Sequence, residues 1–334
     1  MVKSVALRLS KHALRNASVG VVALVWGGAA AAQEYPNRPV SLIVPFAAGG
    51  PTDTMGRLMA QQFQAFFKQT VLVENAPGAG GTIGVDKVVR AAPDGQTILL
   101  MHIGMATAPA LYKRLPFDPN KDLEPIGQVA DVPMTLLTRP TLVPATLKEL
   151  IPYLKANGDK VTIANAGIGA ASHLCGLLFM STIGIDLTTV PYKGTAPAIS
   201  DLVGGQVDLL CDQSTNTVSQ IKAGRVKVIG TTSARRLTQL PNVPTLAEQG
   251  LSGFELGVWH GLYAPRGTPK PILDRLNQAL LATIKDAGFR ARLAEFGVET
   301  VSPELATPQG LRTHLAREIE KWSPIIRKAG IYAD

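Results

Sequence analysis

The stretch VSLIVPF at residues 40–46, followed by AAGGPTD at residues 47–53, predicts a buried strand, a glycine-rich turn and the start of a helix. A second stretch of this kind begins at residue 161, where VTIAN precedes AGIGAASH at residues 166–173. Both turns leave backbone N–H groups uncovered where a helix begins, and the first N–H groups of a helix lack partners within it. Helix starts bind small anions for this reason. Because the turns lie more than a hundred residues apart, we expect two lobes that hold one carboxylate-bearing ligand.

The composition is that of a globular protein that forms a core. Of the 334 residues, 46% are hydrophobic and 17% are charged, which excludes an intrinsically disordered chain and suits two compact α/β lobes. The formal net charge is +8, of which four charges lie in residues 1–32, so the rest carries about +4. This excess is spread along the chain without a Lys/Arg block, so we predict no nucleic-acid partner. It does favour small anions.

The first 32 residues have the pattern of a secretory signal peptide. Residues 3–15 contain four basic residues and no acid, residues 17–26 are apolar, and Ala30–Ala32 offers a cleavage site before Gln33. The alternative is an uncleaved membrane anchor. We therefore predict a periplasmic protein whose mature chain begins after residue 32.

Strand and helix patterns alternate along the mature chain, which predicts an α/β fold with largely parallel sheets. The predicted strands are 40–46, 71–74, 97–101, 134–138, 161–165, 188–192, 207–211, 226–231 and 257–264. The predicted helices begin after Pro51 and lie near 82–92, 146–157, 171–182, 195–204, 215–223 and, with a break at 301–303, 269–331.

Two turns in separate lobes require the chain to cross between the lobes twice. The segments 127–140 and 253–259 are the candidate crossings. We therefore predict one lobe from residues 33–130 plus 257–334 and a second from 131–256. The ligand is expected between them, at the carboxyl ends of the strands.

The two cysteines of this exported chain, Cys175 and Cys211, have two interpretations. Disulfides persist outside the cytosol, and a bridge between them is geometrically possible. The alternative is a pair of buried thiols that act as small hydrophobic side chains.

Several segments together resemble the signature of one family: PFAAGGPTD (45–53), VENAPGAGG (73–81), AASHL (170–174), VPYKG (190–194), GGQVD (204–208), VPT (243–245) and APRGTP (264–269). The chain is similar, in colinear order over 35–334, to the Bug (Bordetella uptake gene) family, the periplasmic substrate-binding component of tripartite tricarboxylate transporters. The resemblance implies a two-lobe periplasmic binding protein of the Venus-flytrap, type II-like class, with mixed sheets flanked by helices. It also implies that the loops 46–53 and 167–173 hold a ligand carboxylate, partly through ordered waters, and that a two-component membrane permease is the partner.

The candidate ligand-binding residues come from these two loops and from side chains that face the expected cleft. We expect backbone N–H groups of Ala47–Gly50 and Gly169–Ser172 to converge on the carboxylate. The full set is Phe46, Ala47, Ala48, Gly49, Gly50, Thr52, Asp53, Thr107, Gly167, Gly169, Ala170, Ala171, Ser172, His173, Tyr192, Lys193, Asp212 and Trp259.

Some of these residues have an ordinary structural interpretation as well. Asp53 contacts the ligand or, as an acid in the first turn of a helix, complements the helix dipole. Lys193 provides a second countercharge or is simply an exposed lysine. Trp259 lines the cleft or packs in the core.

The sequence predicts no enzyme, no metal and no cofactor. Ser172 and His173 are adjacent at a helix start, so they do not face one another, and no G-x-S-x-G surrounds the serine. His102, His173 and His260 lack metal-ligand spacing.

The predicted function is capture of a small carboxylate for a tripartite tricarboxylate-type transporter by a monomeric protein. The alternatives are a sensor that presents its ligand to a membrane histidine kinase, and a secreted hydrolase. Among ligands, a di- or tricarboxylate is favoured by Lys193, an aromatic carboxylate is the main rival, and amino acids rank lower, although Asp212 suits an ammonium group.

Overall fold

The computed structural model describes residues 35–330 and 332–333, so the predicted signal peptide at 1–32 lies outside the described residues. The strands are β1 (Val40–Val44), β2 (Val71–Asn75), β3 (Thr97–His102), β4 (Leu123–Thr138), β5 (Thr162–Asn165), β6 (Thr188–Pro191), β7 (Leu209–Gln213), β8 (Lys227–Thr231), β9 (Gly257–Pro265) and β10 (Glu299–Thr300). The helices are α1 (Pro51–Phe67), α2 (Thr82–Val89), α3 (Gly104–Leu111), α4 (Leu147–Asn157), α5 (Ala171–Ile183), α6 (Thr195–Val203), α7 (Ser214–Lys222), α8 (Lys270–Lys285), α9 (Ala287–Ala294) and α10 (Pro308–Ala329).

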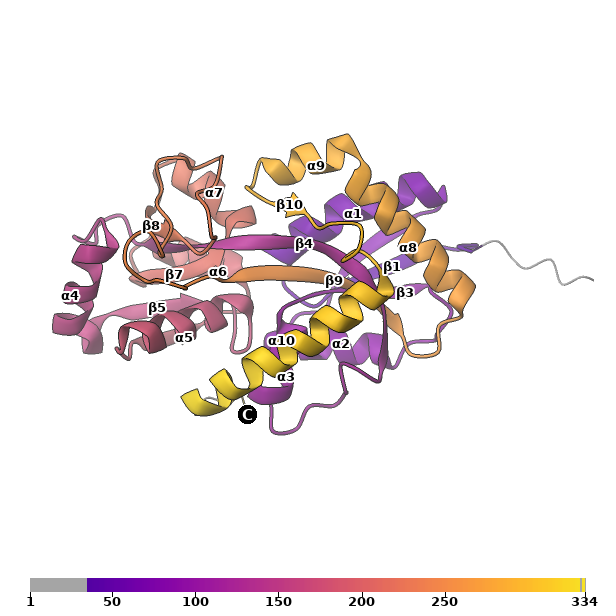
Figure 1. Ribbon diagram of the computed structural model, residues 1–334, viewed down its shortest axis with the longest axis horizontal. Coiled ribbons are helices and arrows are strands. Elements are labelled where there is room, and N and C mark those ends of the chain that lie inside the picture. The colour runs from indigo at the N-terminus through magenta and orange to yellow at the C-terminus, as the bar shows by residue number, and fades with distance from the viewer. Residues whose placement is uncertain (1–34, 331, 334) are drawn as a thin grey trace, which may run out of the picture. The chain divides into compact units, whose positions relative to one another are not determined.

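The strands are hydrogen-bonded in the order β2-β1-β3-β9-β4-β7-β5-β6, while β8 and β10 also pair with β4. The first lobe is built on β2, β1, β3 and β9, and the second lobe on β7, β5, β6 and β8. Strand β4 belongs to both, because its residues 123–133 pair with β9 and its residues 134–138 pair with β7. In Figure 1, β4 and β9 run side by side between the two groups of elements.

The α/β fold with mixed sheets is confirmed, but the expectation of largely parallel pairing is wrong. Parallel pairs join β1 to β2 and β3, and β5 to β6 and β7. The longest strands, β4 and β9, are antiparallel to each other and to their other neighbours. The chain enters the second lobe along β4 and returns to the first lobe at β9, so the two strands run in opposite directions through the same sheet.

Three elements differ from the sequence prediction, and in the first two proline and small residues hide the pattern. Strand β4 begins at Leu123 and not at 134, with Pro125, Gly127 and Pro133 inside it and two shifts of register against β9. These residues weaken a strand signal. Helix α3 has small residues and an internal Pro109. The C-terminal helical stretch is divided into α8, α9 and α10, with β10 between the last two.

The hydrophobic core extends without a break from the first lobe into the second. The largest fully buried side chains include Trp259 and Tyr263 of β9, Phe63 of α1 and Phe179 of α5. Helix α10 packs against α3 and β4, and α1 packs against α8. No helix within the described ranges is both long and apolar enough to cross a membrane.

Candidate functional site

One cavity lies where the loops after β1 and β5 meet the starts of α6 and α7. It encloses about 330 Å³ of space free of atoms, solvent at its mouth included. Its lining residues are Phe46, Ala47, Gly50, Pro51, Thr52, His102, Ala166, Ala170, Ala171, Ser172, Gly194, Thr195, Asp212 and Gln213.

Four helices begin at this cavity. Pro51, Ala171 and Thr195 are the first residues of α1, α5 and α6, and Gln213 is the N-cap of α7. Each helix start carries roughly half a positive charge from its aligned peptide dipoles and its unpaired N–H groups. The cavity is therefore built to stabilise a negative charge with backbone groups.

The first loop is organised around the side chain of Asp53. Its Oδ2 accepts hydrogen bonds from Gly49 N and Arg57 Nε, each at 2.9 Å, and its Oδ1 accepts one from Asn75 Nδ2 at 2.9 Å. Burial alone would raise the pKa of Asp53, but the hydrogen bonds from Arg57, Gly49 and Asn75 outweigh it, so its pKa lies below the ordinary value. Gly49 has a φ of +78°, which glycine adopts without strain. Asp53 holds the loop and does not line the cavity.

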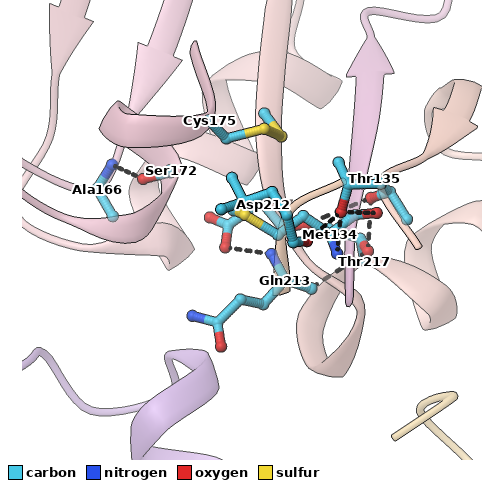
Figure 2. The surroundings of a disulfide bond; sticks show 11 residues. Met134, Thr135, Ala166, Ser172, Cys175, Asp212, Gln213 and Thr217 are labelled. Carbon is cyan, nitrogen blue, oxygen red and sulfur yellow. Dashed lines mark hydrogen bonds between the residues drawn. A yellow bond between two sulfur atoms is a disulfide. The ribbon is translucent and has the colours of Figure 1, made fainter. Parts of the chain in front are cut away.

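The second loop is organised by two side chains of the first turn of α5. Ala166 N donates to Ser172 Oγ at 2.8 Å, as Figure 2 shows, and Gly169 N donates to His173 Nδ1 at 3.2 Å. Gly167 and Gly169 have φ values of +121° and +84°. Because Ser172 Oγ accepts the bond from Ala166, its hydroxyl hydrogen remains available for another acceptor.

The N–H groups available to a ligand differ from those expected. Gly49 N and Gly169 N donate to Asp53 and His173, while Gly50 N donates to Ala47 O and Ala170 N to Gly167 O. These four N–H groups close the loops themselves. N–H groups of the first helical turns remain for an anion, among them those of Thr52 in α1 and of Ala171 and Ser172 in α5, because no carbonyl precedes them in the helix.

The hydrogen bonds of two buried histidines, His102 and His260, show which ring nitrogen of each carries the proton. His102 Nδ1 accepts from Gly104 N at 2.9 Å, so its proton is on Nε2 and it can only donate to a bound molecule. His260 Nδ1 lies 3.0 Å from Val258 O and must donate to it, so its Nε2 accepts from Thr52 Oγ1 at 3.2 Å. Burial lowers the pKa of His102 to about 3 and that of His260 to about 4. Both side chains are therefore neutral in the folded protein at neutral pH.

A carboxylate and an amide stand at the end of β7. Asp212 Oδ2 accepts from Thr195 Oγ1 at 2.8 Å, and its Oδ1 accepts from Gln213 N at 2.6 Å. Asp212 is only 1% exposed, and its burial outweighs these hydrogen bonds and raises its pKa to about 6. Gln213 Oε1 is buried and has no hydrogen-bond partner among the described residues.

A disulfide joins the second loop to this end of β7. Cys175, in the second turn of α5, is bonded to Cys211, and their Cα atoms are 5.9 Å apart. Both residues are buried. Figure 2 draws the bond together with Asp212 and Gln213, which follow Cys211 in β7. The cross-link therefore ties the start of α5 to the strand that carries Asp212.

The structure brings together part of the set of residues expected from the sequence. The predicted residues that line the cavity are Phe46, Ala47, Gly50, Thr52, Ala170, Ala171, Ser172 and Asp212. The predicted residues that do not line it are Ala48, Gly49, Asp53, Thr107, Gly167, Gly169, His173, Tyr192, Lys193 and Trp259.

Most residues of the second set have other contacts. Tyr192 Oη donates to Asp201 at 2.6 Å, and Trp259 Nε1 donates to Glu318 at 3.2 Å from within the core. Thr107 Oγ1 bonds within α3, and Lys193 is exposed. The countercharge that we expected from Lys193 is therefore not in the cavity wall.

Sequence reasoning missed a second group of lining residues. His102 and Gln213 end the buried strands β3 and β7, and a polar residue in that position is a signal of a ligand site that could have been used. His102 also stacks on Phe46 with ring centroids 4.4 Å apart. The missed residues are Pro51, His102, Ala166, Gly194, Thr195 and Gln213.

The two lobes touch at the loops that contribute to the cavity. Asn216 Nδ2 of α7 donates to Gly49 O at 3.0 Å, and Tyr112 Oη donates to Ile168 O at 3.3 Å. A Cβ on Gly194 would stand 3.0 Å from that of Ala47, so the backbones also approach closely. Residues of the two lobes are thus in direct contact next to the loops that line the cavity.

Comparisons with known proteins show the family and the fold of this chain. The family described as the tripartite tricarboxylate transporter family receptor (TctC) matches residues 55–331. The structure of the periplasmic binding protein BugD is 50% identical, with a TM-score of 0.87 over 89% of this chain and 99% of BugD. MatC from Rhodopseudomonas palustris, with bound malate, is 39% identical, with a TM-score of 0.84 over 87% of this chain and 100% of MatC. Another R. palustris protein, with adipate, is 32% identical, with a TM-score of 0.85 over 89% of this chain and 99% of that chain.

The fold is therefore that of the two-lobe periplasmic binding proteins, and the loops that resembled Bug signatures are the loops that meet at the cavity. This chain belongs to the tripartite tricarboxylate transporter receptor family, to which the resemblance to Bug proteins pointed.

Proposed function

We propose that this protein captures a small organic carboxylate in the periplasm and delivers it to a two-component membrane permease of the tripartite tricarboxylate type. The observation that carries the proposal is the convergence of four helix starts on one cavity between the lobes. Helix starts stabilise an anion without a cationic side chain. MatC, a relative with the same fold, has malate bound.

The proposal places the ligand between a first lobe of residues 33–130 plus 257–334 and a second lobe of residues 131–256. The carboxylate accepts from N–H groups of Thr52, Ala171 and Ser172 and from the Ser172 hydroxyl. The protein acts as a monomer that closes on its ligand and opens at the permease.

The proposed role includes no chemical step. Ser172 Oγ accepts from Ala166 N, and His173 Nδ1 accepts from Gly169 N. The two side chains therefore hold the loop and are not arranged as a nucleophile and its base.

A binding screen tests the carboxylate. We expect thermal shifts with one or more small mono-, di- or tricarboxylates, because a ligand that binds only the folded state raises the melting temperature. Methyl esterification of the bound carboxyl group should weaken binding at least about 100-fold, since the ester lacks the charge that the helix starts stabilise. An ester or a neutral sugar that binds as tightly as the acid would contradict the proposal.

A pair of variants tests the location of the site. Ala171→Leu should abolish binding, because Ala171 lines the cavity and a larger side chain fills it. Tyr192→Phe is the matched control: Tyr192 lies outside the lining and donates to Asp201, so its affinity should stay within about twofold of the wild-type value. Equal affinity in both variants would place the ligand elsewhere.

A further inference from the structure

We propose that a groove between α5 and α10 is a second binding site, and that it takes a free amphiphile with one medium-length alkyl chain and an anionic head. The α5–α10 groove shares no lining residue with the cavity at the loops after β1 and β5, which we call the first cavity. The proposal therefore goes beyond the capture of a small carboxylate and does not depend on it.

The α5–α10 groove is large enough for a small molecule. It encloses about 890 Å³ of space free of atoms, solvent at its mouth included, which is more than the first cavity encloses. Sites for small molecules typically measure roughly 300–1,000 Å³. In Figure 1 the last turns of α10 lie below α5. The residues that line the groove are Leu174, Leu177, Leu178, Ser181, Trp322, Ile325, Ile326 and Lys328.

The walls of the α5–α10 groove are two apolar helix faces. The lining residues of α5 are spaced i, i+3, i+4 and i+7, and those of α10 from Trp322 to Ile326 are spaced i, i+3 and i+4. This spacing places each set on one face of its helix. The lining of α5 from Leu174 to Ser181 extends about 10 Å along the helix axis. A single alkyl chain of medium length laid along α5 would contact these residues in turn.

The side chains leave little for a polar occupant to bond along most of the groove. Trp322 Nε1 donates to Glu318 Oε2 at 3.0 Å, so its indole N–H already has an acceptor. Ile325 is 41% exposed, although it is a large hydrophobic residue. Removing such surface from water is favourable, by an amount that grows with the apolar area covered. An alkyl chain therefore suits the groove better than a sugar or a short polar acid.

The sign of the head group follows from the charges at the groove. Lys328 is the one charged residue among the lining residues. No ion pair joins it to another residue within the described part of the chain, and the exposed Arg327 lies beside it in the same last turn of α10. A carboxylate at the end of the alkyl chain would be attracted to this turn. The ordinary role of a last-turn lysine is to complement the helix dipole, which by itself gives no alkyl-chain site.

The experiment is calorimetric titration of the mature protein with hexanoate, octanoate and decanoate, all kept below the concentrations at which they form micelles. We expect affinity to rise about fourfold for each added methylene, because each one buries further apolar surface in the groove. Decyltrimethylammonium has the same chain as decanoate but a cationic head, and should bind at least about threefold more weakly. Lys328→Glu should reverse the order of these two ligands.

A pair of variants locates the binding. Ile325→Glu should weaken decanoate at least about 10-fold, because it puts a carboxylate beside the alkyl chain. Ile83→Glu is the matched control, since Ile83 is 56% exposed and does not line the groove; its affinity for decanoate should not change. Ala171→Leu fills the first cavity and leaves the groove as it is, so it should bind decanoate like the wild type. Circular dichroism and melting temperature establish that the variants are folded.

Three outcomes would overturn the proposal. The first is an affinity that does not depend on chain length or that is equal in Ile325→Glu and the wild type. The second is decanoate binding that is lost in Ala171→Leu and kept in Ile325→Glu, which would place the ligand in the first cavity. The third is binding to phosphatidylglycerol vesicles without binding of decanoate, which would make the groove a membrane contact. In each case the capture of a small carboxylate is unaffected, since its own screen tests it.

Discussion

Asp53 is a residue whose position in the sequence suggested two roles and whose contacts in the structure support one of them. Its carboxylate accepts from Gly49, Arg57 and Asn75 and so joins the first loop, α1 and β2. A first-turn acid stabilises a helix through the dipole, and here it also closes the turn that leads to the cavity. Asp53 thus holds the conformation of the first loop but does not line the cavity.

Asp53→Asn should therefore destabilise the protein by about 1–3 kcal/mol at neutral pH, because its amide nitrogen would face donors that now bond to a carboxylate. The pKa of Asp53 is lowered in the folded state, so its contribution is present above the unfolded value of about 3.9 and is lost as pH falls through the lower folded pKa. Urea unfolding at pH 7 and pH 3 measures this. Asp94→Asn, at an exposed ion pair with Arg38, is the control and should change stability by under about 1 kcal/mol. A penalty for Asp53→Asn that is equal at both pH values would contradict the prediction.

The buried histidines predict a loss of stability in mild acid. The pKa values of His173 and His260 are lowered to about 4 by burial. Below about pH 6.5 the unfolded chain takes up these protons and the folded chain does not, so each histidine reduces stability by up to about 1.4 kcal/mol per pH unit. His260→Gln should reduce the slope of unfolding free energy against pH between 4.5 and 6.5. An unchanged slope would show that His260 is not kept neutral.

At the scale of elements, the disulfide joins α5 to β7, and these two carry the second loop and Asp212. The bond therefore fixes the start of α5 relative to the strand that carries Asp212. Parallel β5 lies between β7 and β6 in the same sheet, so the cross-link reinforces an arrangement that strand pairing already defines.

Replacing both cysteines by serine should lower the free energy of unfolding by about 4 kcal/mol, from the entropy of closing a loop of this size in the unfolded chain; the sequence separation is 36 residues. Denaturant unfolding with and without reductant measures this. Reductant should lower the wild-type stability to that of the Cys175→Ser/Cys211→Ser variant and leave the variant unchanged. If reductant destabilises the variant as much as the wild type, the effect does not come from this bond.

At the scale of the whole molecule, the bonds from Asn216 to Gly49 O and from Tyr112 to Ile168 O join the lobes beside the cavity. The strands that connect the lobes, β4 and β9, are long and paired with each other. Such a connection allows the lobes to hinge while each keeps its own hydrogen bonds. The population of the closed form then depends on how far these few bridging contacts and the bound ligand lower its free energy relative to that of the open form.

Asn216→Ala should shift that balance toward the open state, because it removes one bridging bond and nothing in the core. We expect ligand affinity to fall about 2- to 10-fold and the radius of gyration without ligand to rise, with both forms equally compact at saturation. Small-angle scattering and calorimetry measure the two effects. Asn157→Ala, whose side chain bonds within α4, is the control. Equal scattering curves for Asn216→Ala and the control in the absence of ligand would argue against a bridging role.

The sequence was sufficient for the local structure around the site. The turns at 47–50 and 166–170 were predicted because glycine at positive φ and bare helix starts are local properties. Helices such as α5 and α7 were placed within one or two residues, since their apolar spacing is also local. The family resemblance then connected these segments to one fold.

Long-range packing determined the features of the fold and of the site that the sequence did not predict. Strand β4 continues through Pro125 and Pro133 because β9, α8 and α10 cover it, which no local pattern reveals. His102 and Gln213 reach the cavity because β3 and β7 end at the same place in space, although more than a hundred residues separate them. Lys193 does not reach it, because its direction depends on how the loop before α6 packs. Backbone conformation follows from neighbours in the chain, but the partners of a side chain follow from how distant elements pack together.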